Sequence, residues 1–127
     1  MSTTQAILWI DHRSAQILAF EGDGTEREKK IRAHTHPTPQ HGSQVRTEHE
    51  FFGAVCDGLA GIPQVLVVGP RTGLADFDRY ARKHRPQTAE RLVDRRVMDH
   101  PTTHQLPALA RRFFEGRDAR ASSPSAS

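Results

Sequence analysis

The sequence predicts a single α/β domain built on a mixed five-stranded sheet. An uninterrupted VLVV run at 65–68, with no polar alternation, is typical of a central parallel strand that is covered on both faces. Residues 6–31 instead contain two short apolar segments and a third, polar one, separated by turn residues, which is typical of an antiparallel meander. Helical patterns then alternate with strands through the rest of the chain.

The meander comprises strands over Ala6–Ile10, Ala15–Phe20 and Thr25–Ile31. The polar DHRS sequence at 11–14 ends the first strand, and the turn at 21–24 joins the second to the third. The third strand is charged throughout, so we expect it at an edge of the sheet, where charges discourage association.

Residues 32–46 contain two prolines, three histidines and almost nothing apolar, which predicts an exposed, mobile loop. Thr47 and Glu50 have the spacing of a capping box and predict that a helix begins at Thr47. Gly61 is the predicted stop. The apolar stripe of this helix consists of Phe51, Phe52, Val55, Cys56 and Leu59.

A second helix is predicted from about Thr72 to the residue before Pro86, with Leu74, Phe77 and Ala81 on its buried face. A strand follows from about Leu92, although residues 89–92 also suit a continued helix.

Thr102 or Thr103 is the predicted cap of a last helix, whose apolar residues recur at helical spacing between 106 and 113. The small and polar residues from Gly116 onward predict a disordered tail over 116–127, which leaves a single domain over 1–115.

This order of elements, β-β-β-α-β-α-β-α, corresponds to a ribonuclease H-like arrangement with the first strand beside the fourth and helices on both faces. Right-handed crossovers bring the ends of the first, fourth and fifth strands to one edge, which is where open α/β sheets bind ligands. The polar residues expected at that edge are Asp11, His12, Arg71, Thr72, Asp99 and His100.

Composition limits the classes of function. With 127 residues and 35% hydrophobic residues, the chain has a modest core, no apolar run long enough to span a bilayer, and no signal-peptide pattern at its start. We therefore expect a cytoplasmic protein.

The lone cysteine, Cys56, cannot form an internal disulfide and is expected to be a small core residue.

The net charge of +3 conceals an asymmetry. Residues 1–70 have six Lys or Arg against eight Asp or Glu, whereas residues 71–127 have twelve against seven, and fifteen of the eighteen cations are arginine. Arginine presents a planar fork that suits phosphate and stacks on bases, so the balance favours RNA, although a solvated basic face has the same composition. The expected phosphate contacts are Arg71, Arg79, Arg82, Lys83, Arg111 and Arg112.

Two segments resemble a known family. LVVGPRTGLADFDRYARKH at 66–84 is similar to the strand, Gly-Pro turn and helix in the central domain of Pelota and the archaeal-eukaryotic class I release factors, and AILWIDHRSAQILAF at 6–20 resembles the start of that domain. Small bacterial translational machinery proteins share the Trp-Ile-Asp-His start, a histidine-rich loop, Val-Gly-Pro, and Asp-His-Pro-Thr before the last helix. The resemblance covers about residues 5–115.

This resemblance implies a domain related to one that lies near the peptidyl-transferase and tRNA sites of the ribosome. We therefore expect a ribosome- or RNA-associated factor, in ribosome rescue or dormancy, that binds without catalysis or a cofactor. In release factors the long loop contains Gly-Gly-Gln, which helps water attack the peptidyl-tRNA ester. Here the loop has Gly42, Ser43 and Gln44, and serine reaches the backbone conformations of the second glycine only at a cost. Peptide release by this loop is therefore an alternative that the residues disfavour.

Metal-dependent nucleic-acid cleavage is a second alternative, with Asp11, Glu48 or Glu50, and Asp99 as the metal ligands. The fourth strand ends in Gly-Pro and supplies no carboxylate there, and the site would be flanked by arginines.

Histidines raise a third alternative, because His34, His36, His41 and His49 near the loop could hold zinc or copper or contact a protein partner. No cysteine pair or His-Glu-x-x-His pattern accompanies them. The repeated Asp-His at 11–12 and 99–100 could orient an imidazole as a base, or the aspartates could simply cap turns. A protein partner or a homodimer also stays open.

Overall fold

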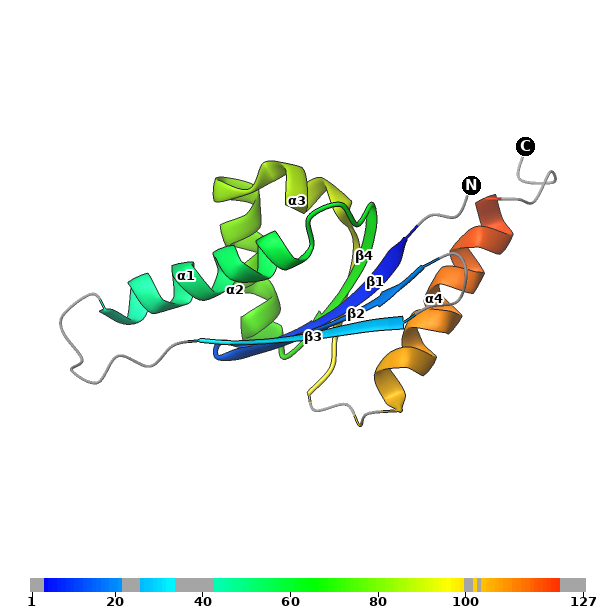
Figure 1. The fold of residues 1–127 in the computed structure, drawn as a ribbon, viewed down its shortest axis with the longest axis horizontal. Coiled ribbons are helices and arrows are strands. Elements are labelled where there is room, and N and C mark those ends of the chain that lie inside the picture. Colours follow the sequence, from blue (N-terminus) through cyan, green and yellow to red (C-terminus); the bar gives the residue numbers. More distant parts are fainter. Residues whose placement is uncertain (1–3, 22–25, 34–42, 100–101, 103, 122–127) are drawn as a thin grey trace.

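The computed structural model describes residues 4–21, 26–33, 43–99, 102 and 104–121. Within these residues the elements are β1 (Gln5–Ile10), β2 (Ser14–Phe20), β3 (Glu26–Arg32), α1 (Ser43–Gly58), β4 (Gln64–Gly69), α2 (Arg71–His84), α3 (Pro86–Arg91), β5 (Leu92–Val97) and α4 (Gln105–Ala121). Figure 1 shows α1, α2 and α3 on one side of the sheet and α4 on the other. None of the described helices is long and apolar enough to cross a membrane.

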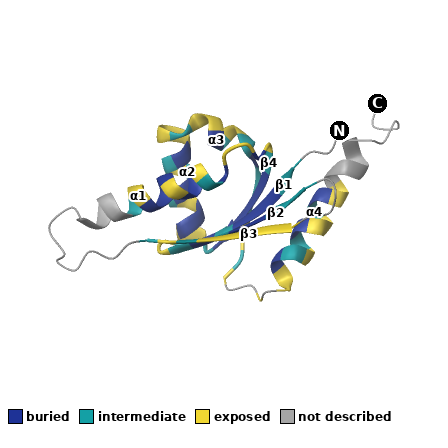
Figure 2. Ribbon diagram, viewed as in Figure 1, coloured by how far each residue is buried: buried dark blue, intermediate teal, exposed yellow. Residues whose placement is uncertain are grey.

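The sheet has the strand order β3-β2-β1-β4-β5. β1 pairs antiparallel with β2 and parallel with β4, and β5 extends the parallel half beyond β4. β3 lies at the edge, as its charges predict, and is almost wholly exposed (Figure 2). The predicted ribonuclease H-like fold with a mixed five-stranded sheet is therefore confirmed.

β1 and β4 are buried on both faces because successive side chains of a strand point to opposite sides. On one face, a core forms between the sheet and α1 and α2; its members include Leu8, Ile10, Phe52, Val65, Val67 and Phe77. On the other face, a smaller core forms under α4; its members include Ile7, Leu66, Val68, Leu106, Ala110 and Phe114. The VLVV run thus lacks polar alternation because helices cover both sides.

Helix α1 begins at Ser43, so two predictions at its start were wrong. The loop does not extend to residue 46, and Thr47 lies inside the helix rather than at its N-cap. Gln44 and Arg46 are good helix formers, and extending an existing helix costs little compared with starting one. Of the triplet that resembles Gly-Gly-Gln, Gly42 lies outside the described residues, whereas Ser43 and Gln44 open a helix.

Pro86 follows α2 as predicted and also opens the short helix α3. Proline is tolerated at the first helical position because its missing amide would have no acceptor within the helix. The chain therefore stays helical to Arg91, and β5 begins at Leu92 as the sequence predicts.

Thr102 caps α4, which confirms one of the two predicted caps. The backbone N–H of Gln105 donates to Oγ1 of Thr102 at 3.3 Å, and the N–H of Thr102 donates to Oε1 of Gln105 at 2.8 Å. This is a reciprocal capping box. The predicted disorder from Gly116 was wrong over residues 116–121, because α4 continues to Ala121. One glycine costs a helix only about 1 kcal/mol, and the alanines and arginines after it favour helix.

Candidate functional site

The carboxyl ends of β1, β4 and β5 lie at one edge of the sheet because these strands are parallel. The Gly69-Pro70 turn leads from this edge directly into α2. A Cβ at Gly69 would overlap the carbonyl oxygen of Ile10, and a Cβ at Gly73 would lie 3.0 Å from the Cα of Asp11. The two glycines therefore let the first turn of α2 pack against the end of β1.

The Asp11 carboxylate closes the turn between β1 and β2. Its Oδ1 accepts the backbone N–H groups of Arg13 and Ser14, each at 2.7 Å, and the Ser14 hydroxyl at 3.2 Å. This is the capping role that the sequence left open beside catalysis. The carboxylate is consequently occupied in holding the hairpin.

His12 contacts a carboxylate other than that of its neighbour. Its Nε2 lies 2.8 Å from Oδ2 of Asp76 on α2, and both groups are at the surface. This contact links the β1–β2 hairpin to α2. No local pattern in the sequence predicts this pairing with Asp76, because it depends on how α2 packs against β1.

The other described residues predicted at this edge make fewer side-chain contacts. The Trp9 indole donates to the carbonyl oxygen of Asp99 at 3.1 Å, which brings the chain after β5 back to β1. Thr72 and Asp99 are exposed, and α2 has Pro70 at its N-cap with no side-chain capping bond. His100 lies outside the described residues. The chain segments that meet at this edge are thus held together mainly by contacts to turns and to backbone groups.

The described residues contain no group of three His, Cys, Asp or Glu side chains that could hold a metal ion. Asp11, Asp99 and the α1 glutamates therefore do not form the metal centre considered above, while His34, His36 and His41 lie outside the described chain.

Cys56 is a buried core residue, as predicted. Burial raises the pKa of its thiol to about 11, and the nearby Arg85 cation offsets only part of that effect. The thiol therefore stays protonated at neutral pH and is a poor nucleophile.

The predicted phosphate-binding residues fall into two sets on opposite faces of the sheet. Arg71, Arg79, Arg82 and Lys83 are exposed on α2, whereas Arg111 and Arg112 are exposed on α4. Two of these cations are already paired: Arg82 with Asp78 at 3.1 Å, and Arg111 with Glu26 at 3.3 Å. We refer to Arg71, Arg79 and Lys83 as the α2 cations; none of them has an ion pair with a described residue.

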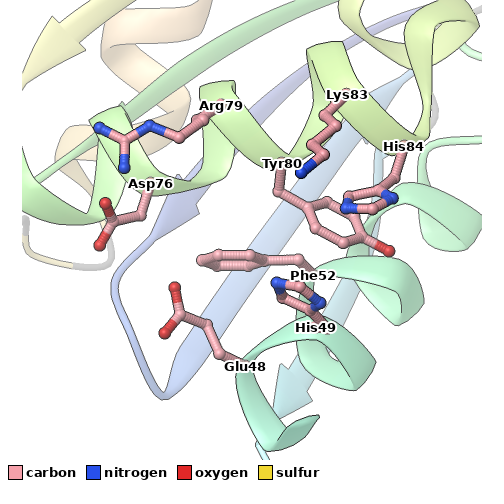
Figure 3. Close-up of a pocket in the computed structure, with 8 residues that line it drawn as sticks. All are labelled: Glu48, His49, Phe52, Asp76, Arg79, Tyr80, Lys83 and His84. Carbon is pink, nitrogen blue, oxygen red and sulfur yellow. The ribbon is translucent and has the colours of Figure 1, made fainter. Parts of the chain in front are cut away.

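A groove of about 220 Å³ lies between α1 and α2 (Figure 3). We call it the α1–α2 groove. Its lining combines cationic, anionic and aromatic side chains: Glu48, His49, Phe52, Asp76, Arg79, Tyr80, Lys83 and His84. The five α2 residues in this set recur at i, i+3, i+4, i+7 and i+8, so they form one stripe along the helix.

Three rings form a cluster in this groove. The ring centroids of Tyr80 and His84 are 4.9 Å apart, and His49 on α1 lies 5.3 Å from Tyr80 and 5.4 Å from His84. Phe52 is buried below them, 5.6 Å from Tyr80. The cluster therefore joins the hydrophobic core to the exposed surface of both helices.

The Tyr80 hydroxyl lies close to α1 at Gly53, which has no side chain. A Cβ at Gly53 would lie 3.2 Å from the Tyr80 hydroxyl oxygen. Beside it, Arg85 pairs with Asp57 of α1 at 2.9 Å. Its hydrogen bond and ion pair with Asp57, followed by the Tyr80 hydroxyl, raise the pKa of Arg85. Arg85 therefore stays charged, and its ion pair with Asp57 links the end of α2 to α1.

Sequence reasoning missed Asp76, Tyr80 and His84. The helical spacing of residues 76, 79, 80, 83 and 84 was the available signal, since it predicts a polar and aromatic stripe beside the buried one. Only α1, however, turns this stripe into a groove. The sequence assigned His49 to a possible metal site near the loop, whereas it faces Tyr80 and His84.

No protein-family model matches the sequence, and no curated protein matches it either. Similar solved structures include Pelota of Thermoplasma acidophilum, with 13% identity over 98% of this chain and a TM-score of 0.56. Pelota of Archaeoglobus fulgidus has 19% identity over 93% of this chain and a TM-score of 0.60. An archaeal translation termination factor, aRF1, has 16% identity over 93% and the same TM-score.

This chain spans only part of each neighbour: 34% of the first Pelota structure, 35% of the second and 39% of aRF1. At these identities the likeness concerns the fold. The chain therefore shares its fold with one part of Pelota and of aRF1, which agrees with the resemblance in its sequence motifs.

Proposed function

We propose that this protein is a cytoplasmic, translation-related factor that binds the ribosome or its RNA without catalysing a reaction. The observation that carries the proposal is the exposed side of α2, where the α2 cations Arg71, Arg79 and Lys83 lack ion pairs with described residues. Cations that no carboxylate neutralises are available to an external anion.

Helix geometry supports a shared partner for these cations. With 3.6 residues per turn and 1.5 Å rise per residue, the three residues lie within about 120° of the helix circumference and span about 18 Å. A rigid row of this kind can contact successive phosphates of one strand, and such contacts supply most of the sequence-independent affinity for nucleic acid.

The fold supports a role in translation. One structural neighbour is a translation termination factor, and the others are Pelota proteins. The Trp-Ile-Asp-His, Val-Gly-Pro and Asp-His-Pro-Thr motifs also favour the small bacterial translational machinery proteins and, with them, a role in ribosome rescue or dormancy. Because the chain spans about a third of the neighbours, we propose a binding role and not their complete activities.

Binding is favoured over hydrolysis. The Asp11 carboxylate is occupied by turn contacts, and Ser43 replaces the second glycine of the release-factor triplet. A hydrolase would depend on Gln44, whereas a binding factor would not. Turnover of peptidyl-tRNA by the Gln44→Ala variant separates these two functions.

Sedimentation with ribosomes tests the proposal directly. We expect the protein to co-sediment with ribosomes from growing or starved cells in low salt, and Arg71→Gln to weaken the association. Lys30→Gln on β3 is the matched control, because Lys30 is exposed and already pairs with Glu28 at 3.4 Å. Absence of the protein from ribosomal fractions of both cell types, even in low salt, would refute the proposal. Crosslinking would map the contact.

A further inference from the structure

We infer that the α1–α2 groove binds one unpaired nucleotide of RNA, with its base against the ring cluster and its phosphate against Arg79 and Lys83. This inference rests on the proposed function, because it assigns a site to part of the RNA contact. It goes further in naming the ligand as a single unstacked nucleotide. The α2 cations alone would bind a duplex equally well.

The ring cluster supplies a stacking surface. Tyr80, His84 and His49 already contact one another at centroid distances of 4.9 to 5.4 Å, so a base cannot enter between them and must stack on their outer side. Both histidines are exposed, and buried Phe52 holds Tyr80 from below. Bases of unpaired RNA stack on tyrosine and histidine in this way.

Arg79 and Lys83 lie close enough to the ring cluster to bind the phosphate of such a nucleotide. Arg79 and Lys83 each precede a ring residue of α2 and line the same groove. They are separated by four positions, which puts their Cβ atoms about 5–6 Å apart on a helix. A phosphate attached to a base on Tyr80 and His84 would therefore lie within reach of both cations.

Two carboxylates of the groove affect which bases fit. Glu48 and Asp76 both line the groove, Asp76 lies beside Arg79 in Figure 3, and its carboxylate is 2.8 Å from His12. Carboxylates accept hydrogen bonds from the exocyclic amino groups of cytosine, adenine and guanine, and they repel a second phosphate. The groove should therefore prefer these bases to uracil.

The size of the groove agrees with a ligand no larger than a nucleotide. Its volume of about 220 Å³ is below the roughly 300 Å³ at which pockets for drug-sized molecules begin. Because the groove is open at the surface, the neighbouring nucleotides of a strand can continue past it.

Binding of short single-stranded oligoribonucleotides to the full chain tests the inference, with fluorescence anisotropy as the readout. Tyr80→Ala should lower the affinity for a five-nucleotide cytidine oligomer about tenfold, a typical loss for one stacking side chain. Tyr80→Phe, which keeps the ring, should stay within about twofold. A uridine oligomer should bind several-fold more weakly than cytidine, and free cytidine monophosphate more weakly than the oligomer.

Three results would overturn the inference. If Tyr80→Ala bound the oligomer with unchanged affinity and still sedimented with ribosomes, the groove would be excluded as the RNA site, while the proposed function would stand. Equal affinity for the free monophosphate and the oligomer would assign the site to a free nucleotide instead of RNA. The third concerns the wild-type protein, in which bound oligomer should protect His49 and His84 from diethyl pyrocarbonate. Equal modification with and without the oligomer would exclude the site even if Tyr80→Ala failed to fold.

Discussion

Neutralising two of the three α2 cations should remove most of the salt dependence of RNA binding. Each phosphate contact to a single strand contributes a slope of about −0.7 to the logarithm of affinity against the logarithm of salt concentration. Contacts from Arg71, Arg79 and Lys83 together give a slope of about −2, so wild-type affinity should fall roughly twentyfold between 50 and 200 mM salt.

In the Arg79→Gln/Lys83→Gln variant, one contact is left, and the slope should be about −0.7 with less than about a threefold loss over the same salt range. The assay is anisotropy of a labelled twelve-nucleotide RNA at four salt concentrations. Stability should change by less than about 0.5 kcal/mol, because both side chains are exposed and unpaired within the described structure.

A matched control exists on β3. Arg27 and Lys30 are exposed and paired with Glu21 and Glu28, so Arg27→Gln/Lys30→Gln removes the same charge from a different surface. This control should retain the wild-type slope. If the α2 variant also retained it, or if both variants lost it equally, net charge would govern binding and the reasoning from the α2 surface would be wrong.

Three further predictions concern the fold. Gly69→Ala should lower the free energy of unfolding by about 2 kcal/mol or more, since a Cβ would overlap the Ile10 carbonyl; Gly116→Ala in α4, with no atom within 4 Å of the added Cβ, should raise it by about 0.5–1 kcal/mol. Urea denaturation measures both, and equal effects would contradict the account of the turn. Thr102→Ala should cost about 1 kcal/mol through loss of the α4 cap, so an unchanged melting temperature would rule out that role. The Cys56 pKa is raised to about 11, whereas an unfolded thiol titrates near 8.5; the native state then holds the extra proton, and stability should fall as pH rises through this window. Cys56→Ala should show a smaller loss, and identical pH profiles would argue against this burial effect.

The sequence predicted the layout of the sheet because its signals are local and periodic. The VLVV run at 65–68 marked β4 as central, and the charges of 26–32 marked β3 as an edge. Element ends were harder to predict. The capping pattern predicted a helix start at Thr47, but the residues before it also favour helix, and α1 begins at Ser43. At the other end, residues after Gly116 favoured helix more than their small polar composition indicated.

The candidate site was predicted less completely, because its parts come from different elements. The sequence identified Arg79 and Lys83 as phosphate contacts, which stays a prediction, but it could not show that α2 and α4 present their cations on opposite faces. It placed Asp11 and His12 together, whereas the fold separates their contacts: Asp11 caps its own turn, and His12 reaches Asp76 on α2.

The sequence by itself therefore determined the α/β class, the order of strands along the chain and the burial of Cys56, and it limited the cap of α4 to Thr102 or Thr103. These features depend on hydrophobic period and on contacts between near neighbours. Only the tertiary structure brought His49 of α1 against Tyr80 and His84 of α2 and so formed the α1–α2 groove. The physical reason is that the two helices pack closely, with Gly53 lying against Tyr80. The residues that meet are far apart in the sequence, so no local pattern predicts their contact.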